Sequence, residues 1–267
     1  MPLAVCATPI GNLDDVTLRV LEELRAADVV LCEDTRHTRG LLQRHGIRAR
    51  LLSYHEHNEG KRVAELLPRL VAGERMALVS DAGLPAISDP GARLVRAALD
   101  ADLPVTVLPG ASAGETALVA SGLVSERYQF LGFLPRGRAA LAAVWQELRG
   151  WPYPAVAFES PQRLPATLRS LAEVEPDREV AVCRELTKVH EEIVRGTAAS
   201  VAARFAEPPR GEITLVIGAG AGATPDVEAA GAAVSELVAA GVPRARAAAI
   251  VARLTGASRN ELYRRTL

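Results

Sequence analysis

The sequence predicts an α/β protein built of two α/β domains and a short carboxy-terminal helical module. Over residues 1–111, short apolar runs alternate with amphipathic helical patterns, which is typical of a domain with a parallel sheet. Over residues 112–217 several strand-like runs follow one another directly, and after residue 225 only helical patterns remain. We therefore expect a domain boundary near residue 112, a linker at 218–225 and a helical module at 226–267.

The first domain is expected to hold a mostly parallel sheet with helices on both faces. Asp89 followed by Pro90 fits a helix N-cap with a proline in the first turn, and Ser160 with Pro161 repeats that pattern in the second domain. The predicted strands are residues 3–8, 28–32, 49–53, 75–80 and 104–108, and the predicted helices are residues 15–27, 37–45, 59–72 and 90–101.

The second domain is expected to contain a mixed sheet. The runs between residues 179 and 195 are not separated by a helix, which favours some antiparallel pairing. The predicted strands are residues 128–133, 153–159, 179–184, 188–195 and 212–217, and the predicted helices are residues 112–122, 138–149, 161–173 and 197–206.

The carboxy-terminal part of the chain begins with the Gly/Ala-rich residues 218–225, which we interpret as a flexible linker. These residues loosely match a dinucleotide-binding fingerprint, but that motif needs a βαβ unit and only helices follow. Helices are expected at 226–240, at 244–255 and from the capping box of Ser258 and Glu261 to the end. Six arginines and one acidic residue lie after residue 240. They form either a solvated helical face or, with Tyr263, a small nucleic-acid-binding surface.

Composition and charge limit the classes of protein to which this chain can belong. With 49% hydrophobic and 24% charged residues the chain is typical of a globular protein. Because its net charge is only −1, any affinity for nucleic acid must come from a local patch of positive charge. Cys6, Cys32 and Cys183 lie in apolar runs without a CxxC pair, which predicts buried, reduced thiols. No run reaches the ~20 apolar residues that span a bilayer, and no leader pattern is seen, so we expect a cytoplasmic protein that does not bind membranes.

The most informative segment is the loop from Ser80 to Gly91, called the aspartate loop below. It lies between an apolar run and a helical pattern, which places it at the carboxyl end of a parallel sheet, where α/β proteins bind ligands. The loop offers the carboxylates of Asp81 and Asp89 but no lysine, arginine or glycine-rich phosphate cradle. It therefore suits a ligand with positive charge and hydroxyl groups, such as S-adenosylmethionine, better than a nucleotide pyrophosphate.

Polar segments also follow other strands of the first domain. Residues 8–13, 33–38, 55–59 and 109–113 each come directly after a predicted strand. Each of them alone is also explained as a plain βα turn. Polar loops that end neighbouring parallel strands share one edge of the sheet, which predicts a single cleft. The pair His55 and His57 is a weak metal-binding pattern, and we expect a substrate-facing loop and no metal.

Nine segments carry a resemblance that covers nearly the whole chain. They are T-P-I-G-N-L (8–13), E-D-T-R-H-T (33–38), H-x-H-N-E (55–59), S-D-A-G-x-P-x-I-x-D-P-G (80–91), P-G-x-S-A (109–113), G-F-L-P (132–135), E-S-P-x-R-L (159–164), R-E-L-T-K (184–188) and G-E-I-T-L-V-I (211–217). In this order they resemble the ribosomal RNA small subunit methyltransferase I family, a branch of the tetrapyrrole methylase superfamily. The carboxy-terminal helices are similar to the helix-turn-helix appendage of that family.

The resemblance implies a two-domain tetrapyrrole methylase fold with the cofactor in a cleft between the domains, and a homodimer. It implies S-adenosylmethionine-dependent 2′-O-methylation of a cytidine ribose in the decoding region of 16S ribosomal RNA, so 16S RNA and the 30S subunit would be the partners. The cofactor contacts that it implies are Pro9, Asp81, Ala82, Gly83, Leu84, Ser112, Ala113, Leu186 and Ile213, with further residues near Glu159.

Methyl transfer to a ribose hydroxyl needs positioning and a base or hydrogen-bond acceptor within ~3 Å of this weak nucleophile. The sequence does not choose among the candidate bases Asp34, His37, His57 and Glu159. Phosphates would meet Arg36, Arg136, Arg138 and Lys188. The full set of candidate catalytic residues is Asp34, His37, His57, Asn58, Glu159 and Lys188. Two other functions stay open: a tetrapyrrole-type C-methyltransferase, which would share the fold, and a non-catalytic ribosome-binding factor.

Overall fold

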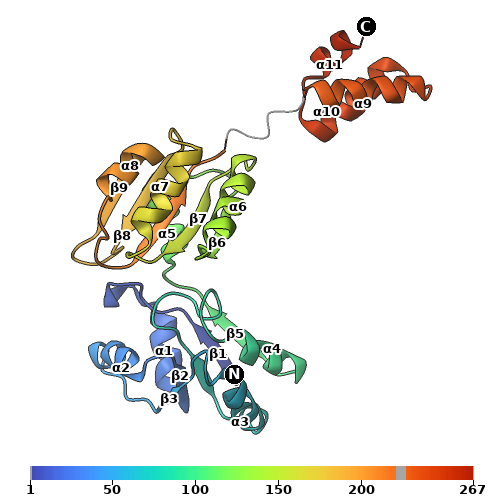
Figure 1. The fold of residues 1–267 in the computed structure, drawn as a ribbon. Coiled ribbons are helices and arrows are strands. Elements are labelled where there is room, and N and C mark those ends of the chain that lie inside the picture. The colour runs from blue at the N-terminus through green and yellow to red at the C-terminus, as the bar shows by residue number, and fades with distance from the viewer. Residues whose placement is uncertain (1, 221–226, 267) are drawn as a thin grey trace. The chain divides into compact units, whose positions relative to one another are not determined.

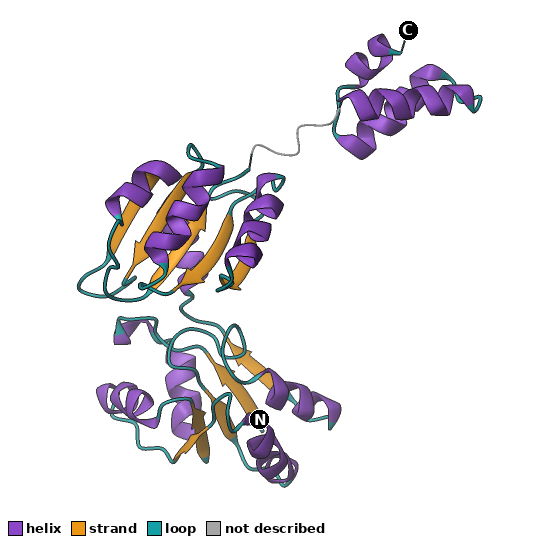
Figure 2. Ribbon diagram, in the orientation of Figure 1, coloured by secondary structure: helices purple, strands orange, loops and turns teal. Residues whose placement is uncertain are grey.

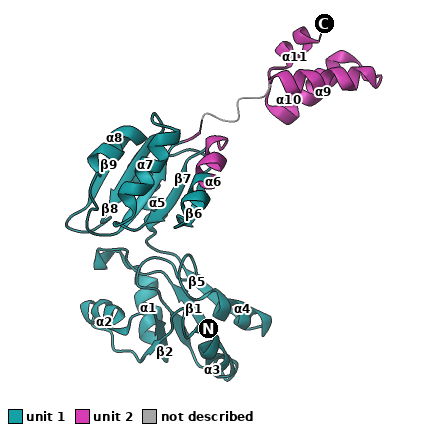
Figure 3. Ribbon diagram, viewed as in Figure 1, with its two compact units in different colours: residues 1–142, 153–218 teal, residues 143–152, 219–267 magenta. Residues whose placement is uncertain are grey.

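The computed structural model describes residues 2–220 and 227–266. This part of the chain contains two five-stranded sheets with their helices and three carboxy-terminal helices (Figures 1 and 2). The predicted fold class is therefore confirmed. Contacts divide the chain into one compact unit of residues 1–142 and 153–218, which holds both sheets, and a second unit of residues 143–152 and 219–267 (Figure 3). The predicted domain boundary near residue 112 stays a prediction.

The first sheet is fully parallel, in the order β3-β2-β4-β1-β5. Side chains of α1 and α2 form the core on one face, and side chains of α3 and α4 form the core on the other. The predicted parallel sheet with helices on both faces is thus observed. Its elements are β1 Leu3–Cys6, α1 Leu18–Ala26, β2 Val29–Cys32, α2 Thr35–Arg44, β3 Leu51–Ser53, α3 Glu59–Val71, β4 Met76–Leu78, α4 Ala92–Asp100 and β5 Val105–Leu108.

Four helix starts differ from the predictions by two or three residues: those of α1, α2, α4 and α7, of which α2 begins at Thr35 and was expected from residue 37. The helix expected from residue 15 begins at Leu18, because Leu13–Asp15 forms a separate 3₁₀ turn and the Thr17 side chain caps α1. Asp89 does not cap α4, whose N-cap is Gly91 with φ of 137°. Ser160 does not cap α7, because a turn closed by hydrogen bonds from Arg163 N and Leu164 N to its carbonyl follows it, and Arg163 is the N-cap. In both wrong predictions the proline belongs to the loop before the helix.

The second sheet is mixed, in the order β6-β7-β10-β8-β9, as the sequence predicts. β6 and β7 are parallel, whereas β10 is antiparallel to β7 and β8, and β9 is antiparallel to β8. The strand expected at 188–195 lies at 192–197, because Glu185 and Thr187 take positive φ values of 53° and 65° and turn the chain after β8. The elements are α5 Ala113–Ser121, β6 Gln129–Phe133, α6 Arg138–Arg149, β7 Ala155–Glu159, α7 Leu164–Val174, β8 Glu179–Arg184, β9 Glu192–Thr197, α8 Ala198–Arg204 and β10 Ile213–Ile217.

The cores explain the chemistry of the three cysteines. Cys6 and Cys32 lie in the core between the first sheet and α1 and α2, and Cys183 lies in the core between the second sheet and α5. All three are free and buried, as predicted. Burial raises the pKa of Cys6 to about 12 and that of Cys183 to about 11, so both stay protonated and unreactive near neutral pH.

The three carboxy-terminal helices are α9 Val227–Ala239, α10 Arg244–Thr255 and α11 Arg259–Arg265, and they share an aliphatic core around Val234, Val251 and Leu262. The Ser258 side chain caps α11 by accepting the Glu261 N–H, as the capping-box spacing predicts. Of the predicted linker, residues 221–225 lie outside the described residues. No helix in the described ranges is long and apolar enough to cross a membrane.

Candidate active site

The candidate active site lies at the carboxyl edge of the first sheet. Because the five strands are parallel, the loops that follow them all emerge at this edge. The segments that start at Thr8, Glu33, His55 and Pro109 and the aspartate loop are therefore neighbours there, as the sequence predicts. The order of the strands reverses around β1 and β4, and such a switch point is where α/β sheets bind their ligands.

The aspartate loop is tied to the end of β1. The Thr8 N–H donates to the Gly83 carbonyl at 2.8 Å, and the Gly83 N–H donates back to the Thr8 carbonyl at 3.1 Å. The Thr8 hydroxyl also donates to the Ser80 carbonyl at 3.0 Å. Gly83 takes a φ of 79°, which favours glycine. This pairing holds the backbone of Ala82 and Gly83 beside Pro9.

The far end of the aspartate loop is held by Glu59, a residue of the H-x-H-N-E segment. One carboxylate oxygen of this buried residue accepts the Tyr54 hydroxyl at 3.0 Å and the Gly91 N–H at 3.0 Å. Between these anchors Ala86 and Ser88 have φ values of 70° and 62°, which non-glycine residues seldom adopt. Strained backbone of this kind is found at functional sites, where surrounding contacts enforce it.

Three carboxyl groups lie close together at this edge. Burial, together with the charges of Glu33 and Asp81, raises the pKa of Asp89 to about 6. Burial and the charge of Asp81 likewise raise the pKa of Glu33. Asp81 accepts the Asp34 N–H at 3.1 Å. The sequence-based site set lacks Glu33 and Asp89. Glu33 could have been found in the sequence, because two adjacent acidic residues, Glu33 and Asp34, follow a predicted strand. Asp89 was interpreted as a helix cap.

Two of the residues with an implied cofactor role, Leu186 and Ala113, belong to one apolar cluster, whereas Leu84 packs against the core formed with α3 and α4. Ile10, Leu186 and Ala117 share a core with the partly buried Ala111 and Ala113. The Asn12 N–H donates to the Thr187 hydroxyl at 2.9 Å, so the loop after β1 contacts the turn after β8. Beside this contact is a hollow of about 450 Å³. The hollow is lined by residues 11–14, Arg44 and residues 187–189.

Two other implied contacts are Ile213 and Ser112. Ile213 begins β10 and is paired in register with Arg184, two residues before Leu186. The Ser112 hydroxyl donates to the Glu115 carboxylate. The implied contacts thus come from five segments: the loop after β1, the aspartate loop, the start of α5, the turn after β8 and the start of β10. Their cofactor role stays a prediction.

Of the candidate bases, the Asp34 carboxylate is hydrogen-bonded and ion-paired, whereas the His37 ring has no partner among the described residues. The Asp34 carboxylate accepts the Arg36 backbone N–H at 2.7 Å and its guanidinium at 2.7 Å. These hydrogen bonds hold the pKa of Asp34 well below its usual range, which makes it a weak base. His37 is exposed on the first turn of α2, and within the described residues its ring makes no hydrogen bond or ion pair.

His57 is exposed, and its ring centroid lies 5.9 Å from that of His55. The Asn58 side chain is occupied inside its own loop: its amide oxygen accepts the His55 N–H at 2.9 Å and its amide nitrogen donates to the Ser53 carbonyl at 3.3 Å. These hydrogen bonds hold the Asn58 side chain against the backbone of its own loop. No group of three or more possible metal ligands is found in residues 2–220 and 227–266. The expectation of no metal stays a prediction.

Glu159 and Lys188 are both fully paired. The Glu159 side chain is completely buried, and its oxygens accept the Ser160 N–H at 2.7 Å and the Thr167 hydroxyl at 2.7 Å. Such a carboxylate holds β7 to α7 and has no free path to a substrate hydroxyl. The Lys188 ammonium pairs with Glu185 at 2.8 Å and Glu212 at 3.0 Å, beside the loop after β1.

Comparisons with known proteins assign the chain to a family. The model of the tetrapyrrole (corrin/porphyrin) methylases matches residues 2–202, and the model of the RsmI C-terminal HTH domain matches residues 225–267. A ribosomal RNA small subunit methyltransferase I from Mesorhizobium japonicum is 44% identical over 99% of this chain and 91% of its own length. The chain belongs to the ribosomal RNA small subunit methyltransferase I family.

Further members of this methyltransferase family show the same extent of similarity. The relative from Micromonospora olivasterospora is 45% identical over 98% of this chain and 85% of its own length. The relative from Synechocystis sp. is 42% identical over 99% of this chain and 97% of its own length. The family assignment therefore covers both sheets and the carboxy-terminal helices.

Solved structures show the fold. Diphthine synthase covers 81% of this chain and 89% of its own, with a TM-score of 0.62 at 14% identity. Uroporphyrin-III C-methyltransferase from Thermus thermophilus, solved in complex with S-adenyl homocysteine, covers 81% and 96%, with a TM-score of 0.56 at 18% identity. At these identities the likeness is one of architecture alone.

Proposed function

We propose that this protein transfers the methyl group of S-adenosylmethionine to the ribose 2′-hydroxyl of a cytidine in the decoding region of 16S ribosomal RNA. Its family supports the reaction class, and the observation that carries the proposal is the carboxylate cluster of Glu33, Asp81 and Asp89. Carboxylates crowded together in a partly buried site favour a ligand that brings positive charge. S-adenosylmethionine brings a sulfonium and an ammonium group.

The residues at the carboxyl edge fit this cofactor. When bound, its sulfonium supplies the methyl group. Asp81 uses one oxygen to accept the Asp34 N–H, and its other oxygen makes no hydrogen bond to the described residues. That oxygen is suited to a ribose hydroxyl or the ammonium group. The backbone of Ala82 and Gly83, beside Pro9, would meet polar atoms of the cofactor, and Ala113, Leu186 and Ile213 would meet its apolar surface.

We propose an imidazole as the acceptor for the 2′-hydroxyl proton. Of the six candidate catalytic residues, His37 and His57 alone combine exposure with an unpaired titratable group in the described structure. Asp34, Glu159 and Lys188 are held in ion pairs. The exposed Arg36, Arg136 and Arg138 would then bind phosphates of the RNA.

The partners that we propose are the 30S subunit, its 16S RNA and a second copy of this chain. Because the substrate is ribosomal RNA, we place the protein in the cytoplasm. The homodimer follows the resemblance in sequence and is tested by sedimentation equilibrium of the purified protein, where a monomer mass at micromolar concentration would reject it.

The function is tested by offering three substrates in parallel with labelled S-adenosylmethionine. Label is expected in 30S subunits or in 16S RNA, at a ribose 2′-oxygen of a cytidine. Label in uroporphyrinogen would instead identify a tetrapyrrole C-methyltransferase. Cofactor binding without transfer to any of the three would identify a non-catalytic ribosome-binding factor.

A further inference from the structure

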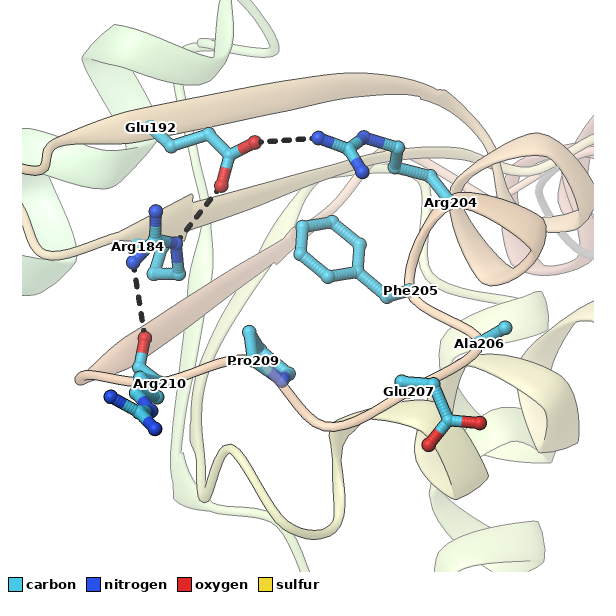
Figure 4. A pocket seen from close by; sticks show the side chains of 8 residues that line it. All are labelled: Arg184, Glu192, Arg204, Phe205, Ala206, Glu207, Pro209 and Arg210. Atoms are coloured by element: carbon cyan, nitrogen blue, oxygen red, sulfur yellow. Dashed lines mark hydrogen bonds and ion pairs between the residues drawn. The ribbon is translucent and has the colours of Figure 1, made fainter.

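A second hollow, of about 410 Å³, lies where β8, β9 and the segment after α8 meet (Figure 4). Its volume falls in the range of about 300–1,000 Å³ that is typical of ligand pockets. Arg184 ends β8, Glu192 begins β9 and Arg204 ends α8, while Phe205 and Pro209 come from the following segment. None of these residues belongs to the carboxyl edge of the first sheet.

The polar wall of this hollow is a single carboxylate shared by two arginines. One oxygen of Glu192 accepts Arg184 Nε at 2.9 Å, and the other accepts Arg204 Nη2 at 3.2 Å. Arg184 Nη1 also donates to the Arg210 carbonyl at 3.1 Å, which fixes the guanidinium between strand and loop. A guanidinium has five N–H donors, so both Arg184 and Arg204 keep donors for another acceptor.

The hollow carries an excess of positive charge. Arg184, Arg204 and Arg210 line it together with two carboxylates, those of Glu192 and Glu207. Glu207 lies at the rim, with its carboxylate directed away from Phe205 (Figure 4). The Arg210 guanidinium makes no ion pair with any residue in the described part of the chain. One phosphate would therefore neutralise the excess charge and meet two preformed guanidinium groups.

The floor of the hollow is apolar. Phe205 is buried, with 5% of the residue exposed, and its ring lies across the hollow from Pro209 (Figure 4). A free inorganic phosphate has no apolar part that could contact this surface, whereas a nucleotide can place its sugar or base on it. Sites that bind single-stranded RNA usually combine guanidinium groups with an apolar or aromatic surface.

We propose that this hollow binds one nucleotide of an RNA strand, with the phosphate on Arg184 and Arg204 and the sugar or base on Phe205 and Pro209. The site deepens the proposed function and rests on it for the identity of the RNA. Arg184 precedes Leu186, an implied cofactor contact, by two residues, which is at most ~7 Å of chain. A strand held in the hollow therefore passes close to the turn after β8.

The first test removes charge from the hollow. The doubly substituted Arg204→Gln/Arg210→Gln protein is compared with Arg48→Gln/Arg169→Gln, which removes two exposed arginines elsewhere. Binding of a mixed-sequence single-stranded RNA oligonucleotide is measured by fluorescence anisotropy at several salt concentrations. We expect about a tenfold loss of affinity and a salt slope smaller by about 0.7, because the variant loses one phosphate contact and each such contact on a single strand contributes about 0.7. The control should match the wild type.

The second test fills the hollow without changing its charge. Pro209→Trp places an indole in the hollow, and Pro208→Trp makes the same exchange at the exposed neighbour outside the lining. We expect Pro209→Trp to weaken RNA binding about tenfold and Pro208→Trp to leave it unchanged. Wild-type affinity in both Pro209→Trp and the double arginine variant would overturn the proposal, as would equal losses in Pro209→Trp and Pro208→Trp.

Methyl transfer to 30S subunits by the wild type separates the two proposals. If the substitutions weaken RNA binding but the wild type transfers no methyl group, the hollow is an RNA site and the methyltransferase function fails. If the wild type methylates 30S subunits and the substitutions leave RNA affinity unchanged, the function stands and the nucleotide site is rejected.

Discussion

At the scale of single residues, Asp81 and Asp89 have the same side chain in different surroundings. Asp81 accepts a backbone N–H, whereas burial and neighbouring carboxylates raise the pKa of Asp89 to about 6. The same loop therefore carries one carboxylate ready to bind a cation and one that titrates near the working pH. The sequence contains both aspartates but does not distinguish them, because the difference in their surroundings arises from burial and from the carboxylates that the fold places near Asp89.

Asp81→Asn is expected to weaken S-adenosylmethionine binding by about 10- to 100-fold, since a hydrogen bond to a charged group contributes about 1.5–3 kcal/mol. The amide oxygen can still accept the Asp34 N–H, so the fold should survive. Isothermal titration calorimetry measures the affinity, with the exposed Asp177→Asn as control. Unchanged affinity would remove Asp81 from the cofactor site.

Asp89→Asn is expected to stabilise the protein at neutral pH. A pKa raised to about 6 means that between pH ~4 and ~6 the folded state binds more protons than the unfolded state. Stability is therefore lost as the pH rises through this window. The shift corresponds to about 3 kcal/mol, which partial exposure reduces to about 1 kcal/mol. Urea unfolding should show this gain at pH 7.5 and little at pH 4; an equal gain at both values would contradict the assignment.

His37→Ala and His57→Ala are expected to leave cofactor affinity near that of the wild type, and at least one of them should slow methyl transfer to 30S subunits by about a hundredfold. Asn58→Ala should slow transfer as well, through loss of the hydrogen bonds that position its loop. Initial rates at saturating cofactor measure the effect. Normal turnover in all three variants would mean that these loops are structural turns.

At the scale of elements, the loop after β1 and the turn after β8 depend on one glycine. A Cβ added at Gly11 would lie 2.5 Å from Lys188 Cγ, 2.7 Å from the Thr187 hydroxyl and 2.8 Å from the Leu186 carbonyl. The carbonyl belongs to the backbone, so one of the two segments would have to move. Both segments hold implied cofactor contacts.

Gly11→Ala is therefore expected to lower the free energy of unfolding by about 1–3 kcal/mol, as overpacking does, and to weaken cofactor binding. Gly40→Ala is the matched control, because Gly40 lies inside α2 with open space around it. The control should stabilise the protein by up to about 1 kcal/mol, since alanine is the better helix former. Thermal unfolding and cofactor titration of both variants give the comparison, and identical behaviour would exclude the close approach.

Element types could be predicted from the sequence more reliably than element ends. Alternating apolar runs and helical patterns indicated the ten strands of the described sheets, because burial imposes that periodicity wherever the strands lie. The starts of α4 and α7 were predicted wrongly because the chain makes a further turn after Asp89 and after Ser160, so that Gly91 and Arg163 are the N-caps. The strand after β8 was placed early because positive φ values at Glu185 and Thr187 depend on contacts with distant residues.

At the scale of the whole molecule, the carboxy-terminal helices have a core of their own, and the Gly/Ala-rich stretch precedes them. Deleting residues 224–267 is expected to leave a folded, cofactor-binding protein. Binding to 30S particles should weaken and depend less on salt, because the deletion removes all six arginines after residue 240. The measurement compares full-length and truncated protein at two salt concentrations. Equal affinities and equal slopes would show that the helices do not contribute to RNA binding.

The sequence by itself determined the α/β architecture, the mixed second sheet, the buried cysteines and the family, because each depends on local pattern or on motifs in linear order. Only the tertiary structure decided which site residues are available. Burial and pairing occupy Glu159, Lys188 and Asn58 and leave His37 and His57 free. It also brought Arg184, Glu192 and Arg204 to one hollow. Availability depends on burial and on the partners that each side chain meets in the folded chain, and charge and burial at a point in space sum over groups from the whole chain.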